Sequence, residues 1–220
     1  ASLVSCAATG DRSTAAGEAG SLPQATAAGA AQPQQPLPEQ HLTDDLMFDI
    51  LLAEIAGQRG ELETSVPHYL QAAENARDPR VAERAVQIAS FAKQYAVAER
   101  AAQRWVELAP EDVEAHKALT VLALHLGDTE EAIKQLDYLI RTAEDPEEGY
   151  SLATALLARD TDKESALLTM ERLIAYHPEN PHAWLALSRM SVNAGKLDKG
   201  LDAVNRALQL SPDLPEAVML

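Results

Sequence analysis

Basic residues and cysteine are both scarce in this sequence. Its 220 residues include 18 Lys+Arg against 34 Asp+Glu, which gives a formal net charge of −16. Such a charge repels nucleic acids at long range, so the composition argues against a nucleic-acid partner. Cys6 is the single cysteine, so the chain cannot form an intrachain disulfide. Since no run of about 18 apolar residues occurs, the sequence also predicts no membrane-spanning helix.

Aromatic residues are few as well, at 4% of the chain, although hydrophobic residues make up 46%. Alanine and leucine supply most of this apolar material, and runs of β-branched residues are nearly absent. Alanine and leucine favour helices, whereas β-branched and aromatic residues favour strands. The composition therefore predicts an all-α protein with enough apolar material for a sizeable core.

Motifs for catalysis and for metal binding are missing too. The sequence contains no HExxH or CxxC ligand set, no phosphate-binding glycine loop and no GxSxG nucleophile motif. Of the six histidines, His116 falls at a packing position, and His125 is nine residues away, where it faces another side of a helix. We therefore expect no catalytic residue, no metal site and no cofactor in this chain.

The first six residues contain a short processing motif. Residues 3–6, Leu-Val-Ser-Cys, resemble the bacterial lipobox, in which an aliphatic residue and two small or aliphatic residues precede a lipidated cysteine. This resemblance implies that residues 1–6 are the remnant of a lipoprotein signal peptide and that Cys6 carries the lipid. Ala7 follows the cysteine, as in lipoproteins sorted to the outer membrane. The alternative is an incidental cysteine in a flexible terminus.

Residues 7–42 are rich in Ala, Gly, Pro, Gln, Ser and Thr, and Pro33, Pro36 and Pro38 interrupt any helix. Such a composition buries too little apolar surface to offset chain entropy. We therefore predict a disordered tether that spans roughly 30–36 Å as a random coil.

A repeat of 34 residues organises the rest of the chain. Pro110, Pro178 and Pro212 are 68 and 34 residues apart, which is twice and once this period. A 34-residue period with small residues, a glycine turn, an alanine and a closing proline is typical of tetratricopeptide repeats. The clearest unit begins at Pro181 and ends at Leu214. The sequence thus resembles the tetratricopeptide-repeat family, which implies a right-handed superhelical solenoid of helix pairs.

The same frame divides residues 43–220 into five repeats and the start of a sixth. Within a unit, small residues are expected where the two helices touch, as at Ser188 and Gly200, and Gly195 is expected to end the first helix. Asp78, Asp112, Asp145 and Asn180 fall where the N-caps of the first helices belong. The predicted units cover about residues 46–78, 79–112, 113–146, 147–180 and 181–214, with a sixth beginning at 215–220.

Two positions depart from the repeat pattern. In the unit 79–112, a small residue, Ala102, stands where a bulky one is usual, and Trp105 stands where a small one is usual. We predict that the indole fills the volume that Ala102 leaves, because a core tolerates exchanges that conserve volume. Pro67 lies inside the expected second helix of the first unit and should delay or kink it.

Repeats of this family bind partners in a concave groove lined by the first helix of each unit. The frame predicts a lining of mixed apolar and polar residues, which suits an extended peptide or a partner's helix. The lysine and asparagine set that clamps chaperone C-termini in some family members is absent, which argues against a chaperone partner. The predicted lining residues are Arg80, Glu83, Gln87, Phe91, Glu114, Lys117, Val121, His125, Arg159, His182, Arg189 and Asn193.

A narrower resemblance covers roughly residues 42–145. The segments LTDDLMFDILLAEIAGQRGELETSVPHYLQAA and DPRVAERAVQIA are similar to the start of proteobacterial outer-membrane tetratricopeptide lipoproteins. In some pseudomonads a member of that family binds a periplasmic carboxy-terminal processing protease and delivers substrates to it, among them peptidoglycan cross-link hydrolases. The resemblance implies a non-catalytic adaptor, anchored by lipid to the periplasmic face of the outer membrane.

Two other functions remain open at this stage. One alternative is an assembly lipoprotein of a secretin or pilus machine. The other is the targeting arm of an enzyme whose catalytic domain lies further along the chain. The net acidity also has two interpretations: it keeps a long solenoid soluble, or it selects basic partners. Both ends of the sequence are expected to continue, one into a signal peptide and the other into further repeats or another domain.

Overall fold

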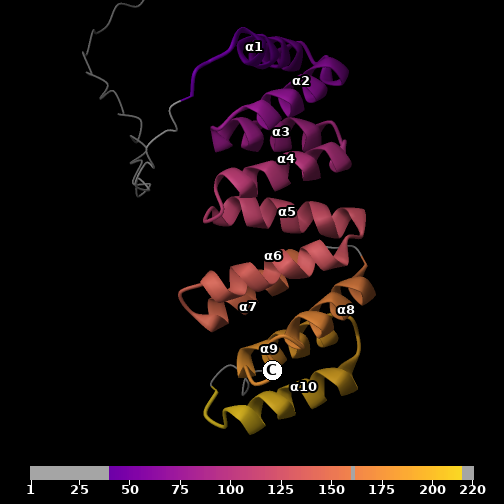
Figure 1. Ribbon diagram of the computed structural model, residues 1–220. Helices are drawn as coiled ribbons and strands as arrows, with labels where there is room; N and C mark the ends of the chain where they lie inside the picture. The colour runs from indigo at the N-terminus through magenta and orange to yellow at the C-terminus, as the bar shows by residue number, and fades with distance from the viewer. Residues whose placement is uncertain (1–39, 160–161, 215–220) are drawn as a thin grey trace, which may run out of the picture. The chain divides into compact units, whose positions relative to one another are not determined.

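In the computed structural model, the described residues are 40–159 and 162–214, all within one compact unit that spans residues 37–220. Regular structure in these ranges is entirely α-helical, which confirms the all-α prediction (Figure 1). Cys6, residues 7–39 of the predicted tether and the predicted start of a sixth unit lie outside the described residues. The helices are α1 (Asp44–Gln58), α2 (Leu62–Asn75), α3 (Pro79–Phe91), α4 (Tyr95–Leu108), α5 (Val113–Leu126), α6 (Thr129–Thr142), α7 (Pro146–Leu157), α8 (Lys163–Ile174), α9 (Pro181–Asn193) and α10 (Leu197–Leu210).

The helices form antiparallel pairs that stack in chain order (Figure 1). Each helix packs against its neighbours along the chain, and two further contacts join first helices, α5 with α7 and α7 with α9. Two others join second helices, α2 with α4 and α6 with α8. Because every contact is local in sequence, each pair completes its core against the pair before and the pair after it.

The first helices begin at the caps that the sequence predicts. The side chains of Asp78, Asp112, Asp145 and Asn180 each accept a hydrogen bond from the backbone N–H two residues later, over 2.9–3.0 Å. Each of these bonds satisfies one of the N–H groups that the first helical turn leaves without a partner. The four caps therefore start α3, α5, α7 and α9 at the intervals that the repeat sets.

Left-handed residues mark the turns inside the pairs. Gly60, Gly127 and Gly195 have φ angles of 75°, 78° and 73°, and Lys93 has a φ of 58°. Only glycine adopts this conformation without steric cost, and Lys93 occupies a position where three other repeats have glycine. Successive members of this set are 33, 34 and 68 residues apart, close to one or two repeat lengths. Counting back from each of them therefore identifies equivalent positions in different repeats.

The departures from the repeat pattern have distinct outcomes. Trp105 is only 7% exposed and belongs to the same buried cluster as Ala102, in agreement with the predicted exchange of sizes. Pro67 does not delay α2, which begins at Leu62 and runs through the proline to Asn75. Gly200 lies inside α10, where an added Cβ would come within 3.1 Å of a Val192 methyl group. The absence of a side chain there lets α10 approach α9.

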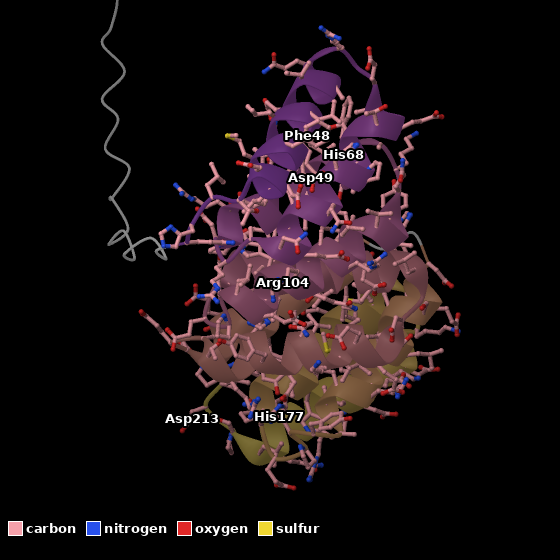
Figure 2. All side chains as sticks on the ribbon, turned by 45° about the horizontal axis from the view of Figure 1, so that its top comes forward. Phe48, Asp49, His68, Arg104, His177 and Asp213 are labelled. Atoms are coloured by element: carbon pink, nitrogen blue, oxygen red, sulfur yellow. The ribbon has the colours of Figure 1, made fainter. Side chains whose placement is uncertain are left out.

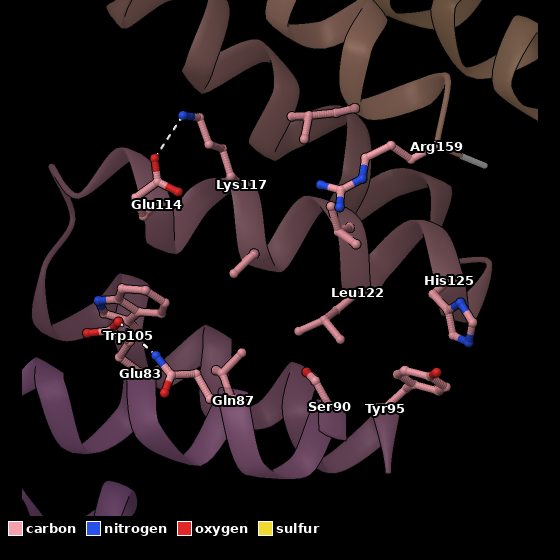
Figure 3. A pocket seen from close by; sticks show the side chains of 14 residues that line it. Glu83, Gln87, Ser90, Tyr95, Trp105, Glu114, Lys117, Leu122, His125 and Arg159 are labelled. Carbon is pink, nitrogen blue, oxygen red and sulfur yellow. Dashed lines mark hydrogen bonds and ion pairs between the residues drawn. The ribbon is translucent and has the colours of Figure 1, made fainter. Parts of the chain in front are cut away.

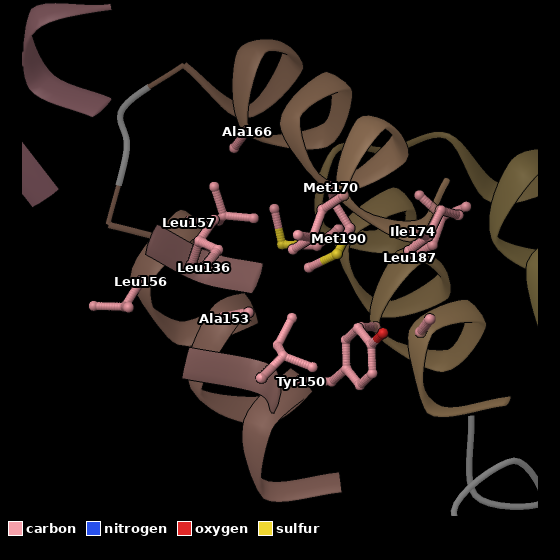
Figure 4. Close-up of a cluster of buried hydrophobic side chains, with 14 of the residues drawn as sticks. Leu136, Tyr150, Ala153, Leu156, Leu157, Ala166, Met170, Ile174, Leu187 and Met190 are labelled. Carbon is pink, nitrogen blue, oxygen red and sulfur yellow. The ribbon is translucent and has the colours of Figure 1, made fainter. Parts of the chain in front are cut away.

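Two large buried clusters form the core of the described residues. One joins α1–α5 and consists largely of alanines, packed around Tyr69 and Trp105. The other joins α6–α10 and contains mostly leucine, isoleucine and methionine, with Tyr150 at one edge (Figure 4). Burial, together with the charge of Asp137, raises the pKa of Tyr150 to about 12. The Tyr150 hydroxyl therefore stays neutral inside the second cluster.

The chain joins the first helix pair before α1 begins. The Gln40 side chain donates a hydrogen bond to the Asn75 carbonyl over 3.0 Å and accepts one from the Arg77 N–H over 2.6 Å. Gln40, which the sequence places in the tether, is thus tied to the turn between α2 and α3. Among the described helices, none combines the length and the apolar character needed to cross a bilayer.

Candidate functional site: a groove between α3 and α5

A groove of about 630 Å³ lies between α3 and α5 and is completed by residues of α4 and α7 (Figure 3). We call it the α3–α5 groove. Several residues that line it occupy equivalent positions in neighbouring repeats: Glu83 and Lys117 are 34 residues apart, and so are His125 and Arg159. Seven of the residues predicted from sequence line this groove: Glu83, Gln87, Glu114, Lys117, Val121, His125 and Arg159.

The floor of the α3–α5 groove is apolar. Leu122 and Leu156 are each 5% exposed, and Val86 is 7% exposed, so these side chains are anchored in the core and show only an edge to the groove. Val121 and Ala118 lie beside them and are partly exposed. A partner's apolar side chain placed here would lose contact with water without requiring the protein to reorganise.

Trp105 forms one wall of the groove, and the carboxylate of Asp112 holds it in place. Its indole N–H donates to Asp112 Oδ2 over 3.0 Å, and Asp112 Oδ1 accepts from the backbone N–H of Glu114 over 2.9 Å. The residue that caps α5 therefore also holds the indole in place. Because Glu114 lies in the first turn of α5, this shared carboxylate sets the position of the charged rim relative to the floor.

The charged rim combines groups of both signs. Lys117 Nζ lies 2.8 Å from Glu114 Oε1, and Gln87 donates to Glu83 Oε1 over 3.0 Å. The guanidinium of Arg159 extends over the groove from the end of α7 (Figure 3). Within the part of the chain that the structure describes, this guanidinium has no hydrogen-bond or ion-pair partner. It is thus available to a carboxylate or carbonyl group of a bound chain.

A pair of rings closes the other end of the groove. The Tyr95 and His125 rings lie with their centroids 3.8 Å apart and their planes tilted by 53° (Figure 3). Tyr95 begins α4 and His125 lies in the last turn of α5, so the two rings bridge neighbouring repeats. Aromatic rings at this end of the groove suit contact with a peptide bond or with a side-chain ring of a bound chain.

The other predicted lining residues lie away from this groove. Arg80 pairs with Asp78 at 2.5 Å, and its guanidinium holds the pKa of that carboxyl below its usual value. Phe91 ends α3 and is 75% exposed. Asn193 accepts a hydrogen bond from Lys163 through its carbonyl, and Arg189 lies half-buried on α9. None of these four residues lines the α3–α5 groove.

His182 lines a second, shallower hollow at the start of α9. This hollow also includes Pro146, Tyr176 and His177 and has a volume of about 570 Å³. His177 Nε2 lies 2.7 Å from Asp137 Oδ1, which ties the hollow's edge to α6. The hollow is built mainly from the turn between α8 and α9 and is separate from the α3–α5 groove.

Several lining residues were not predicted from sequence. Tyr95 and Trp105 belong to α4, a second helix, whereas the repeat frame assigns the groove to first helices. Leu122 and Leu156, which the sequence did not single out, form part of the groove floor. The one signal in the sequence was the exchange of sizes at Ala102 and Trp105, which places an indole where other repeats have a small residue.

Across residues 40–159 and 162–214, no group of three or more His, Cys, Asp or Glu side chains lies close enough to hold a metal ion. The groove instead combines an apolar floor, separated charges and a ring pair, which are the features that recognise a peptide.

Comparisons with known proteins extend these observations. A TPR repeat-containing protein of Pseudomonas aeruginosa, PA4667, is 26% identical over 167 residues, which are 74% of this chain and 28% of that protein. This chain therefore spans only 28% of its relative's length.

Several solved structures align with the chain at low similarity. MamA from Desulfovibrio magneticus is 15% identical, with a TM-score of 0.43 over 80% of this chain and 99% of that one. YrrB, described as a TPR protein with an unusual peptide-binding site, is 17% identical, with a TM-score of 0.41 over 78% of this chain and 89% of that one. The type IV pilus biogenesis factor PilW is 15% identical, with a TM-score of 0.38 over 81% of this chain and 83% of that one.

A family model matches two stretches of the chain. The tetratricopeptide-repeat family model matches residues 70–148 and 150–215, which together are more than half of the chain. The matched ranges include the helices that build the α3–α5 groove. The chain therefore belongs to the tetratricopeptide-repeat family.

Proposed function

We propose that this chain is a non-catalytic adaptor that binds extended segments of other proteins in the α3–α5 groove. The observation that carries the proposal is the convergence of equivalent residues from neighbouring repeats on one apolar floor, with Glu83, Lys117 and Arg159 around it. An extended chain can place alternate side chains on such a floor while its backbone and charged groups meet the rim.

We further propose that the adaptor is anchored by lipid at Cys6 to the periplasmic face of the outer membrane. There it brings together a carboxy-terminal processing protease and its cell-wall hydrolase substrates. The Leu-Val-Ser-Cys motif supports the anchor, and the resemblance of residues 42–145 to outer-membrane tetratricopeptide lipoproteins supports the protease assignment. Tethering raises the effective concentration of one bound protein near another, so the adaptor would accelerate their encounter without any chemistry of its own.

The anchor is tested by mass spectrometry of the protein purified from its native membrane. We expect Cys6 to be the first residue and to carry a diacylglyceryl group and an N-acyl chain. A free Cys6 thiol would contradict the anchor while leaving the groove proposal intact.

The groove is tested with an array of overlapping synthetic peptides from the processing protease and its hydrolase substrates. Binding of each positive peptide is then measured by fluorescence anisotropy with the wild-type chain and with Val121→Asp and Arg159→Glu. We expect each variant to weaken binding by about tenfold or more, because the first places a charge on the apolar floor and the second reverses the unpaired cation.

Lys134→Glu is the matched charge control, because Lys134 projects from α6 outside the groove with 72% of its side chain exposed. It should bind the peptides as the wild type does, apart from a small long-range effect. Binding that survives both groove variants would refute the groove as the site. Binding only of peptides from other proteins would refute the protease assignment alone.

A further inference from the structure

The N-terminal helix of the stack exposes an apolar stripe. Met47, Phe48, Leu51 and Ile55 of α1 are 43%, 59%, 55% and 47% exposed, respectively. We call these four residues the α1 stripe. A terminal repeat that faces water alone carries a polar outer surface, because each repeat otherwise buries its faces against its neighbours. The stripe breaks this rule along two turns of helix.

Equivalent positions in later repeats show what normally covers such a surface. Ile55 lies five residues before the left-handed Gly60, as Leu122 does before Gly127 and Met190 before Gly195. Leu122 and Met190 are 5% and 4% exposed, because each packs against the preceding helix pair. Ile55 is apolar like these two residues, but among the described residues no preceding helix pair packs over it.

The Phe48 position indicates that the missing cover differs from a repeat. Phe48 lies twelve residues before Gly60, and the residues at the same place in later repeats, Ala115 and Ala183, are fully buried. An alanine there lets the preceding helix approach closely, whereas a phenylalanine ring would obstruct that approach. The α1 stripe is therefore shaped for a partner that packs at a larger separation.

The α1 stripe is held in place from behind. On its inner side α1 buries Leu46 and Ala53, and the Ser65 hydroxyl donates to the Ala53 carbonyl over 2.7 Å. The His68 ring bonds to Asp49 at 2.8 Å and meets the edge of Phe48, with centroids 6.1 Å apart (Figure 2). The stripe is thus presented by an anchored helix, so a partner would bind it with little ordering cost.

The charges around the α1 stripe select among possible partners. Residues 40–58 contain four carboxylates and no lysine or arginine. Of these carboxylates, Asp49 is bonded to His68 and Glu54 to Tyr69 and Arg84, whereas Asp44 and Asp45 stand exposed in the first turn. An anionic membrane surface or a second copy of this acidic helix would meet like charge here, and like charges across an interface disfavour association.

We propose that the α1 stripe is a second docking site, distinct from the α3–α5 groove, and that it binds an amphipathic helix of a partner protein. The apolar face of that helix covers Phe48, Leu51 and Ile55, and lysine or arginine residues beside this face lie against Asp44 and Asp45. Helices that bind in this way use apolar anchors spaced three, four and seven residues apart. The site adds a second binding surface to the adaptor, so two partners can be held at once.

The test uses the 220-residue chain and a synthetic 18-residue amphipathic peptide with a leucine stripe flanked by lysines, labelled with a fluorophore. Affinity is measured by fluorescence anisotropy for the wild type, for the double variant Leu51→Ser/Ile55→Ser and for Leu168→Ser. Leu168 is a matched control on α8, at 55% exposure. Circular dichroism verifies that each variant keeps its helix content. We expect the double variant to bind at least about tenfold more weakly and Leu168→Ser to bind as the wild type.

Four further arms distinguish a partner's amphipathic helix from the other possible occupants of the α1 stripe. A peptide with the same composition in scrambled order and a peptide with glutamate in place of lysine should both bind at least about tenfold more weakly. If the scrambled peptide bound as tightly as the amphipathic one, binding would depend on net charge and not on an apolar helix face, and the proposal would be overturned. Flotation of the chain with phosphatidylglycerol vesicles, or a dimer in sedimentation that Leu51→Ser/Ile55→Ser abolishes, would overturn it in favour of a membrane or a second copy.

Discussion

The two buried clusters form the cores of similar helix pairs, but they are built from different side chains. Between α1 and α5 the buried positions are mostly alanines, among them Ala85, Ala98 and Ala102. Between α6 and α10 the corresponding layers hold leucines and methionines such as Leu136 and Met170. Alanines fill little volume, so the first cluster needs close helix approach and a few large rings, whereas the second fills its volume evenly. The two halves should therefore fail under different substitutions.

The largest loss is expected at the ring that fills the alanine-rich cluster. Trp105→Ala removes a side chain that is 7% exposed and surrounded by alanines, which have no flexible atoms with which to refill the space. We predict a loss of about 4 kcal/mol in the free energy of unfolding, measured by urea denaturation. Trp184→Ala is the control, because Trp184 is only partly buried. An equal loss from both variants would show that Trp105 has no special place in the core.

In the leucine-rich cluster, truncating a buried side chain is expected to lower the free energy of unfolding somewhat less than Trp105→Ala does. Neighbouring leucines and methionines can relax into the space that the side chain leaves. Leu136 is fully buried, and Leu136→Ala should lower the free energy of unfolding by about 3 kcal/mol. Leu168→Ala, at an exposed leucine of α8, should change it by less than about 0.5 kcal/mol. Thermal unfolding followed by circular dichroism provides the measurement. A loss below about 1 kcal/mol at Leu136 would contradict the packing described here.

The reverse substitution tests the close approach of helices in the alanine-rich cluster. Ala98 is fully buried in α4, and Ala98→Leu should destabilise the protein by about 2 kcal/mol because the added carbons have no space. Ala155→Leu is the matched control on α7, where the alanine is exposed. It should change the stability by no more than about 0.5 kcal/mol. An unchanged stability of Ala98→Leu would show that the first cluster has space for a leucine, which would contradict the close approach of its helices.

A smaller, stabilising effect is expected at Glu99 on the α4 helix. Burial raises the pKa of Glu99, and the negative charges of Asp128 and Glu131 raise it further. One of its oxygens is buried without a hydrogen-bond partner among the described residues. Because the folded-state pKa lies above the unfolded value, stability falls as the pH rises from the unfolded pKa through the folded pKa. Glu99→Gln should therefore add about 0.5 kcal/mol at neutral pH.

That gain should disappear below the unfolded pKa of about 4.3, where the carboxyl is protonated in both states. Urea denaturation at about pH 7 and about pH 3.5 measures the difference. Glu63→Gln, at an exposed glutamate of α2, controls for the loss of one negative charge. A gain at Glu99 that persists unchanged in acid would contradict the role of its ionisation.

Local signals in the sequence predicted the helix starts well. Asp112 and Asn180 act as caps because a short side chain can reach the N–H two residues ahead, and this geometry depends only on neighbouring residues. Pro67 was less informative, since α2 begins at Leu62 and continues past it. Lys93 carried no signal for its left-handed turn, because the repeat frame rather than its own side chain imposes that conformation.

The groove was predictable only in part. The 34-residue spacing identified Glu83, Lys117 and Arg159 because equivalent positions on packed first helices face the same way. The spacing could not show that Trp105 of α4 reaches the same groove, since that depends on how far apart the two helices sit. The apolar exposure of Phe48 was also hidden, because a sequence does not tell whether a helix has a neighbour on its outer side.

Site-specific photo-crosslinking tests most directly whether this chain binds proteins through the α3–α5 groove. A photoreactive amino acid is placed at Ser90 in the groove and, separately, at Lys134 on α6, and adducts formed in cells are identified by mass spectrometry. The account predicts a defined protein adduct from Ser90 that Val121→Asp abolishes, and none of comparable yield from Lys134. A specific adduct from Lys134 alone, with none from Ser90, would contradict it.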